Sequence, residues 1–221
     1  MWLTITKKTS TKGTTIPIKE STYEIRCTRF LRGQFAGWLD HGAQAESAVK
    51  KCVGALRLAD AIGAKCCVNI SGNAGPGAWD GPSPANLTKE TFQRVVEITR
   101  RIIDEAAPER ASYCLETMPW MYPNSILSYL ELIESINRPR FGVHFDPVNL
   151  INSPEKHYGN GNYIRDAVSR LALRILSVHA KDQVMGPPLT LTMHEVIPGE
   201  GISTMIHCCG NSASWTPTHR C

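Results

Sequence analysis

A short apolar run that ends in a carboxylate decides the fold: Phe141-Gly142-Val143-His144-Phe145-Asp146. Two further runs share this design, since Ser112-Tyr113-Cys114-Leu115 leads into Glu116 and Ile175-Leu176-Ser177-Val178 leads into His179. Each run has the length and composition of a buried parallel strand, and segments with helical spacing separate them. The sequence therefore predicts a parallel sheet in which three strands end on polar side chains.

Helical and strand patterns continue to alternate on either side of these runs. Helices are expected at residues 43–63, 88–106, 125–136 and 162–172, and strands at residues 64–70, 112–117, 141–146 and 174–179. Gly63 is expected to stop the first helix and Thr88 to cap the second. This alternation predicts α/β architecture in a single domain over residues 1–221, with its clear core at residues 43–201. Before residue 41 the pattern is weaker, and two short strands are expected, at Thr15–Lys19 and Tyr23–Cys27.

The three polar strand ends predict a metal site. In a barrel of alternating strands and helices, the carboxyl ends of all strands meet on one face. Glu116, Asp146 and His179 are therefore expected to meet there. Two carboxylates and an imidazole suit a divalent cation such as Mn²⁺, Mg²⁺, Co²⁺ or Zn²⁺. His144 lies two residues before Asp146, so it points to the same side of the strand and is expected beside the ligands.

Each of these residues also has a simpler interpretation, which the sequence leaves open. Glu116 would form a salt bridge at the rim, and His179 would be a core histidine. Asp146 would cap a turn or helix that begins at a proline. Lys181 and Asp182 follow His179 at the same rim of the expected barrel, where the ammonium group would hold a substrate oxygen or phosphate. The alternative for this pair is a solvated ion pair.

Composition and charge narrow the class of protein. The chain has 221 residues and a net charge of +4 with scattered basic residues, so its charge does not call for nucleic acid. No apolar run is long enough to span a bilayer, and the first residues do not begin a signal peptide. The eight cysteines contain no C-x-x-C motif. Adjacent cysteines such as Cys66 and Cys67 point to opposite faces of a strand, so structural thiols in a reducing cytoplasm are expected.

Four segments together resemble a known family. They are Leu-Glu-Thr-Met-Pro-Trp at 115–120, His-Phe-Asp-Pro-Val-Asn at 144–149, Val-His-Ala-Lys-Asp at 178–182 and Val-Ile-Pro-Gly-Glu-Gly at 196–201. Over residues 43–201 the chain is similar to the sugar phosphate isomerase/epimerase family of the xylose isomerase-like TIM barrels. The resemblance implies a (β/α)8 barrel and one divalent metal ion held by Glu, Asp, His and a second Glu. The first three fall on Glu116, Asp146 and His179. Related epimerases have a histidine where this chain has Asn149.

The resemblance also implies a reaction class. A metal that chelates a carbonyl and a neighbouring hydroxyl favours isomerisation or epimerisation of a small sugar or sugar phosphate, through an enediolate or a hydride shift. Glu116 would be a ligand and an acid or base, and Lys181 would orient a substrate oxygen. His144, Asn149, Asp182 and Trp79 are expected near the substrate or the ligands. The Gly- and Pro-rich segment 72–84, which contains Trp79, is either a lid over the site or simply a long loop. A homo-oligomer is compatible with these observations.

Two other classes of function remain open. A phosphodiester hydrolase of the endonuclease IV type would need more histidine ligands, and of the seven histidines only His144 and His179 lie on the expected barrel strands. A non-catalytic chain that keeps the fold but lacks a complete site is the second alternative.

The C-terminal segment, residues 202–221, breaks the pattern. It has no strand or helix period, and back-translation in a shifted reading frame gives a leucine-rich amphipathic helix. We therefore expect this tail to be the product of a frame shift. The family's last strand, with the second Glu, would then be missing, which would leave the barrel incomplete and this polypeptide inactive.

Overall fold

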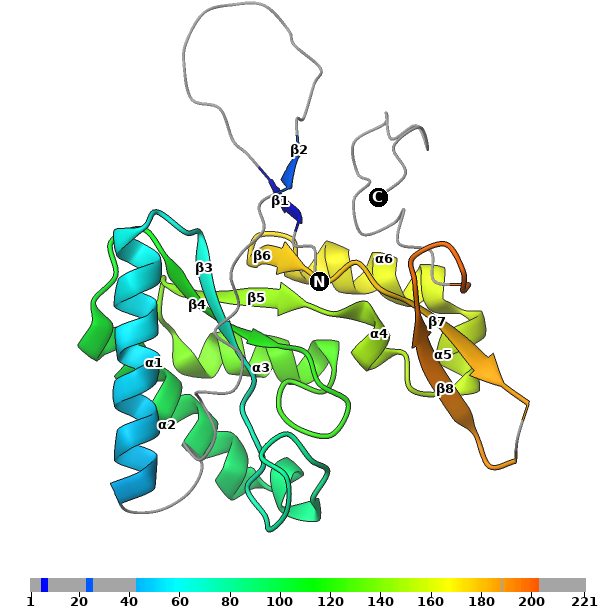
Figure 1. The fold of residues 1–221 in the computed structure, drawn as a ribbon, viewed down its shortest axis with the longest axis horizontal. Helices are drawn as coiled ribbons and strands as arrows, with labels where there is room; N and C mark the ends of the chain where they lie inside the picture. The colour runs from blue at the N-terminus through cyan, green and yellow to red at the C-terminus, as the bar shows by residue number, and fades with distance from the viewer. Residues whose placement is uncertain (1–4, 8–22, 26–42, 188, 203–221) are drawn as a thin grey trace, which may run out of the picture.

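The centre of the molecule is a four-stranded parallel sheet. The computed structural model describes residues 5–7, 23–25, 43–187 and 189–202. In this part of the chain, β3 (Cys66–Asn69), β4 (Ser112–Glu116), β5 (Phe141–Phe145) and β6 (Ile175–Val178) lie side by side in chain order (Figure 1). All three pairings are parallel. The predicted α/β architecture and its four strands are thereby confirmed, with bounds that differ from the predicted ones by one or two residues.

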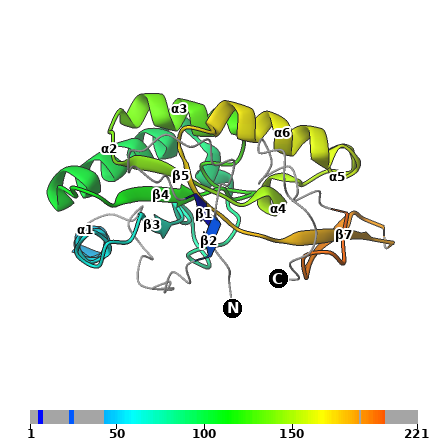
Figure 2. The ribbon, with the colours of Figure 1, turned by 90° about the horizontal axis from the view of Figure 1, so that it is seen from above.

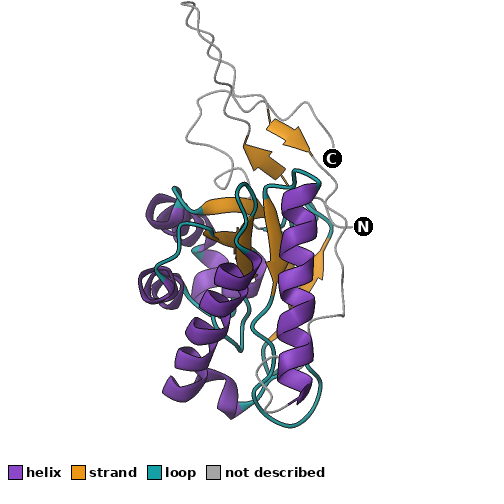
Figure 3. Cartoon of the chain, turned by 90° about the vertical axis from the view of Figure 1, so that its left-hand side faces the viewer, coloured by secondary structure: helices purple, strands orange, loops and turns teal. Residues whose placement is uncertain are grey.

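Helices connect the strands and cover the sheet. They are α1 (Ala43–Ala61), α2 (Lys89–Ala106), α3 (Ile126–Ile136) and α6 (Asn160–Leu171). Helices α2, α3 and α6 lie along one face of the sheet, and α1 lies at its β3 edge (Figure 2). Seen from the α1 side, the helices lie beside and in front of the strands (Figure 3). The core forms between the two layers, where apolar helix residues such as Leu56, Ile102 and Leu132 pack with Tyr113 and Phe141 of the strands.

Local signals in the sequence set the ends of the helices. The Thr88 side chain accepts a hydrogen bond from the Thr91 backbone N–H, as a helix N-cap does. Ser125 and Ser128 form a reciprocal capping box at the start of α3. After α1 the chain turns at Gly63, whose φ of 72° is a conformation that glycine adopts without strain.

Residues 71–86 form a loop that is braced from within by two buried asparagines. The Asn73 amide group donates to the carbonyl oxygens of Pro76 and Ala78, while its oxygen accepts from the Gly75 N–H. The Asn86 amide group donates to the Gly81 carbonyl, and its oxygen accepts from the Ala74 N–H. The loop ends in a 3-10 helix, η1 (Pro84–Leu87).

Between β5 and α6 the chain forms two short helices, α4 (Pro147–Leu150) and α5 (Pro154–Tyr158). Beyond β6 it forms an antiparallel hairpin, β7 (Asp182–Gly186) and β8 (Thr192–Val196), which the sequence did not predict. The hairpin lies at the end of the molecule opposite α1 (Figure 1).

The N-terminal region contributes β1 (Ile5–Lys7) and β2 (Tyr23–Ile25), which pair antiparallel. Strand β2 falls within one of the two strands expected there. The other expected strand, Thr15–Lys19, lies outside the described residues, as does the tail from residue 203 onward. Within the described residues the parallel sheet does not close into a barrel. None of the helices described is long and apolar enough to cross a membrane.

Candidate metal centre

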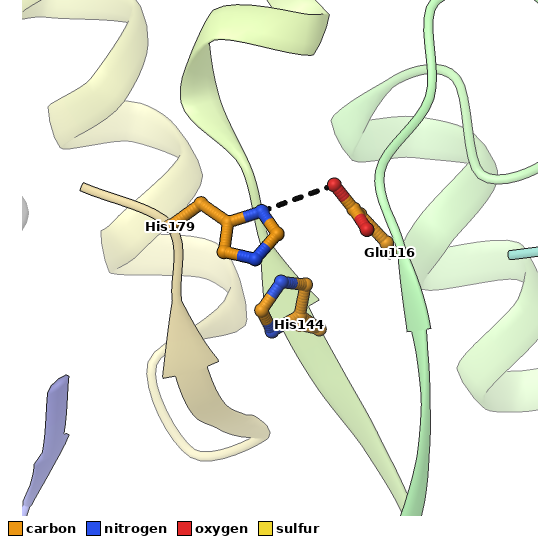
Figure 4. Close-up of side chains that lie close together, drawn as sticks. All are labelled: Glu116, His144 and His179. Atoms are coloured by element: carbon orange, nitrogen blue, oxygen red, sulfur yellow. Dashed lines mark hydrogen bonds and ion pairs between the residues drawn. The ribbon is translucent and has the colours of Figure 1, made fainter. Parts of the chain in front are cut away.

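Three neighbouring strands deliver polar side chains to one edge of the sheet. Glu116 is the last residue of β4, Asp146 directly follows β5 and His179 directly follows β6. Because parallel strands end at the same edge, these residues converge although 63 residues separate the first from the last. Figure 4 shows the Glu116 carboxylate and the His179 ring facing each other, with His144 beside them.

The His179 ring forms the centre of this cluster. Its Nδ1 atom lies 3.1 Å from Glu116 Oε1 and 3.1 Å from Asp146 Oδ2. Ionised carboxylates only accept hydrogen bonds, so in this state Nδ1 carries a proton that both oxygens share. Burial disfavours the charged ring, but the hydrogen bonds to Asp146 and Glu116 outweigh it and raise the pKa of His179 to about 9.

Asp146 uses its two carboxylate oxygens differently. Oδ1 accepts the Val148 backbone N–H at 3.1 Å and so caps α4, while Oδ2 faces His179. The capping role, one of the two interpretations that the sequence left open for this residue, is therefore observed, and the second oxygen faces the cluster. The Thr117 hydroxyl fixes the backbone beneath, since it accepts from the Asp146 N–H at 2.9 Å and donates to the Asp146 carbonyl at 2.8 Å. Burial acts to raise the pKa of Asp146, but its bond to His179 and the charge of Lys181 prevail and lower it.

Lys181 is the second cationic group of the cluster. Its Nζ atom lies 2.8 Å from Asp146 Oδ2 and 3.0 Å from Glu195 Oε2. The lysine is buried, whereas 41% of the Glu195 side chain is exposed. Burial acts to lower the pKa of Lys181, and the two carboxylates reverse this effect and raise it.

His144 lies beneath the cluster and is fully buried. Its ring meets the His179 ring edge-on, with 4.1 Å between the ring centroids. Its Nδ1 atom is 2.5 Å from Ser177 Oγ, which also accepts a hydrogen bond from the Cys66 thiol at 3.5 Å. Burial, followed by the charge of His179, holds the pKa of His144 well below its usual range, so this imidazole is neutral.

Asn149 supports Glu116. Its amide group donates to Glu116 Oε1 at 3.4 Å and to the Thr117 carbonyl at 3.0 Å. Asn149 thereby holds the carboxylate in place. Solvent still reaches the carboxylate, because 14% of the Glu116 side chain remains exposed.

The other residues that the sequence placed near the substrate have different contacts. The Asp182 carboxylate accepts hydrogen bonds from the backbone N–H groups of Gln183, Gly199 and Gly201, so it holds the turn that follows β8. Trp79 is part of the braced loop, where its carbonyl accepts the Asn73 N–H. The neighbouring Trp120 side chain donates to the Asp80 carbonyl and ties this loop to the one after β4.

The cysteines within the described part of the chain are free thiols: Cys52, Cys66, Cys67 and Cys114. Cys66 bonds to Ser177 on the side of the sheet that carries His144, whereas Cys67 packs against the helix-covered core. The adjacent pair therefore points to opposite faces.

The donor set fits a divalent cation. Two ligands at right angles, each about 2.1 Å from an ion, lie about 3.0 Å apart. The distances of 3.1 Å from His179 Nδ1 to the two carboxylate oxygens match this spacing. His144 lies close to this set, since one candidate ligand atom from each of Glu116, His144 and His179 lies within 4.8 Å of the others. An ion in this position would replace the proton now on His179.

Sequence reasoning missed Glu195, Thr117 and Ser177. Glu195 reaches Lys181 only through the β7–β8 hairpin, whose pairing no periodicity in the sequence indicated. Thr117 and Ser177 were detectable in principle, because each is a hydroxyl residue one or two positions from a predicted ligand. Their partners, however, are atoms on a neighbouring strand.

Comparison with known proteins supports the fold. The family profile described as xylose isomerase-like TIM barrel matches residues 21–207. A search of curated proteins gave no match.

Among solved structures, a xylose isomerase domain protein from Planctomyces limnophilus is similar at 26% identity with a TM-score of 0.54. The match covers 78% of this chain and 56% of that one. A xylose isomerase-like TIM barrel protein from Mycobacterium smegmatis, in complex with magnesium, has 13% identity and a TM-score of 0.56 over 76% of this chain and 56% of that one. The IOLI protein with a bound zinc atom has 19% identity and a TM-score of 0.55, and the match covers 77% of this chain and 58% of that one. The chain thus spans little more than half the length of these structures.

Proposed function

The chain belongs to the xylose isomerase-like TIM barrel family, and on that basis we propose that it is a metal-dependent isomerase or epimerase of a small sugar or sugar phosphate. One observation carries the proposal: Glu116 Oε1 and Asp146 Oδ2 both lie 3.1 Å from His179 Nδ1 at the carboxyl ends of parallel strands. Active sites of such barrels lie on this face.

The ion would be held by Glu116, Asp146 and His179, with His144 close enough to join. When bound, a divalent cation supplies Lewis acidity toward a substrate carbonyl and acidifies the neighbouring C–H bond. Carboxylate oxygens with one imidazole accommodate Mg²⁺, Mn²⁺, Co²⁺ or Zn²⁺, so the donor set leaves the identity of the metal open.

Side chains of this protein would transfer the proton and orient the substrate. Glu116 is the group suited to take a proton from the carbon beside the carbonyl and return it to the neighbouring carbon, because its carboxylate reaches solvent. Asn149 holds Glu116 Oε1 from the opposite side and restricts the rotation of the carboxylate. The Lys181 ammonium group lies at the same rim, where it would hold a substrate oxygen. The loop that contains Trp79 would exclude water above the site.

A sugar substrate is supported by the family and by the similar protein from Planctomyces limnophilus, whose description names a xylose isomerase domain. Neither source tells a free sugar from a phosphorylated one, so both belong in a screen. A membrane or nucleic-acid partner has no support in the charge or in the helices described.

The metal centre is tested by calorimetry with Mn²⁺ on Glu116→Gln and His179→Ala. Loss of a group that only supports a ligand typically costs 10–100-fold in affinity, so loss of a ligand should weaken binding by at least about a hundredfold. Glu97→Gln removes the same charge from an exposed position on α2 and should bind as the wild type does. Wild-type affinity in both site variants would rule the metal centre out.

The reaction is tested by screening ketoses, aldoses and their phosphates with Mn²⁺ in deuterated water. Turnover with deuterium on carbon would support proton transfer, and turnover without it would support a hydride shift. If no sugar is turned over by a protein that binds the metal, the non-catalytic alternative is favoured. Two or three zinc ions per chain would instead favour a phosphodiester hydrolase.

A further inference from the structure

Lys181 holds a position that an incoming metal ion needs. Its ammonium group is buried and bridges two carboxylates, 2.8 Å from Asp146 Oδ2 and 3.0 Å from Glu195 Oε2. Asp146 is an expected metal ligand, whereas Glu195 lies on the hairpin outside the expected ligand set.

The contact with Asp146 creates a direct conflict. Asp146 Oδ1 accepts the Val148 N–H as a helix cap, whereas Oδ2 faces His179, so Oδ2 is the oxygen placed to share an ion with His179. That same Oδ2 atom is the one that the Lys181 ammonium group contacts. A divalent ion on Oδ2 would stand within a few ångströms of a second positive charge, and the two would repel each other strongly in this buried site.

Glu195 offers the ammonium group a second anchor. Lysine has a long flexible stem with a compact charge, so its Nζ atom can move away from one oxygen and keep the other. This proposal rests on the metal centre of the proposed function: we propose that Lys181, beside the protonated His179, is a resident cation of the ion-free site. When a divalent ion binds Asp146, the Lys181 ammonium group leaves Asp146 and stays bound to Glu195.

A different role for Lys181 predicts the opposite result. If the ammonium group only positioned Asp146 for the metal, its removal would weaken metal binding. If it competes for Asp146, its removal strengthens metal binding. The sign of the change in affinity therefore separates the two roles without any measurement of catalysis.

The first experiment is calorimetry with Mn²⁺ on the full chain and on Lys181→Met. Hydrogen bonds to charged groups are strong enough that losing the competitor should tighten binding roughly tenfold. Lys156→Met is the matched control, because Lys156 is also partly buried but donates to the Leu150 carbonyl and to Asn152. Its affinity should equal that of the wild type. Unchanged or weaker binding by a folded Lys181→Met would overturn the proposal.

The second experiment uses Glu195→Gln, whose half-exposed side chain makes a folding defect improbable on physical grounds. Without its second anchor Lys181 should hold Asp146 more firmly, so metal binding should weaken roughly threefold. This loss should vanish when Glu195→Gln is combined with Lys181→Met. If metal affinity is still reduced in the double variant, Glu195 acts on the ion directly. That result would overturn the proposed exchange, in which Lys181 gives way to the ion at Asp146.

A third measurement needs no variant. Crystal structures of the wild type with and without Mg²⁺ should show Lys181 Nζ beyond hydrogen-bond distance of Asp146 Oδ2 only when the ion is bound, with Glu195 in contact in both. An ammonium group that stays on Asp146 beside the ion would overturn the proposal. A wild type that binds no divalent ion would overturn the metal centre itself, whereas binding with the wrong response to Lys181→Met overturns the exchange alone.

Discussion

At the residue scale, side chains of the candidate metal centre use one polar atom for the fold and another for the site. Asp146 caps a helix with one oxygen and faces His179 with the other. Asn149 donates to the Glu116 carboxylate and, at the same time, to the backbone carbonyl of Thr117. Ligand atoms are thereby held by the same contacts that stabilise the strand ends, so the geometry of the site is set when the sheet folds.

Thr117 offers a test of this coupling. Replacing it with valine keeps the shape but removes the hydroxyl that pairs with both backbone groups of Asp146. Leaving buried polar groups without a partner costs about 1–3 kcal/mol, so we expect Thr117→Val to lower the free energy of unfolding by about 2 kcal/mol. Urea denaturation followed by circular dichroism measures this change.

Thr117→Ser is the matched control, because it keeps the hydroxyl and loses only a methyl group. It should lose less stability than the valine variant. Equal losses in the two variants would show that packing, and not the hydrogen bonds to Asp146, is the contribution of Thr117.

The convergence of Glu116, Asp146 and His179 was accessible from the sequence, because it depends only on where parallel strands end. Only one of the two partners of Lys181 was accessible in this way. Asp146 follows from the strand ends. The other, Glu195, depends on how residues 182–196 fold back, and no residue of β8 is fully buried, so burial imposed no period there.

At the element scale, strands and helices with one buried face were predictable, because burial imposes a period on the sequence. Helix α2 has such a face, with Val95, Thr99, Ile102 and Ala106 buried. The β7–β8 hairpin lacks it, since residues 189–191 and residues 194 and 195 are exposed.

The capping box of α3 can be tested in the same way as the Thr117 hydroxyl. Ser125→Ala removes the side chain that accepts the Ser128 backbone N–H, and the loss of such a cap typically costs about 1 kcal/mol. We expect the midpoint of urea unfolding to fall while the slope of the transition stays unchanged. Ser169→Ala, at an exposed position within α6, is the control and should be neutral or slightly stabilising, since alanine favours helices. A neutral Ser125→Ala would mean that tertiary packing alone fixes the start of α3.

At the scale of the whole molecule, metal binding and folding should be linked. An ion that binds only the folded chain stabilises it by about 2.7 kcal/mol at a concentration one hundred times its Kd. For a chain of this size, that corresponds to a rise in Tm of about 5–10 °C. Scanning calorimetry with Mn²⁺ should show this rise, and a chelator should reverse it. A Tm that does not respond to saturating metal would contradict a site made by three separate strands.

Membership of the family accounts for the parallel sheet. The chain spans 56% of the similar structure from Planctomyces limnophilus, so its whole activity stays a proposal. The expected frame-shifted tail falls outside the described residues, and sequencing of the coding DNA tests it directly. A shifted frame without a leucine-rich helix and a following strand that ends in Glu would refute it.

The asparagine-braced loop, residues 71–86, has a kinetic consequence. Asn73 and Asn86 between them engage backbone groups of Ala74, Gly75, Pro76, Ala78 and Gly81. Because two side chains hold all of these backbone groups, we expect the amide protons of the segment to exchange with solvent through one shared opening event. The entropy cost of ordering this glycine-rich segment is then met during folding. Any closure over a ligand would move the loop as a rigid unit.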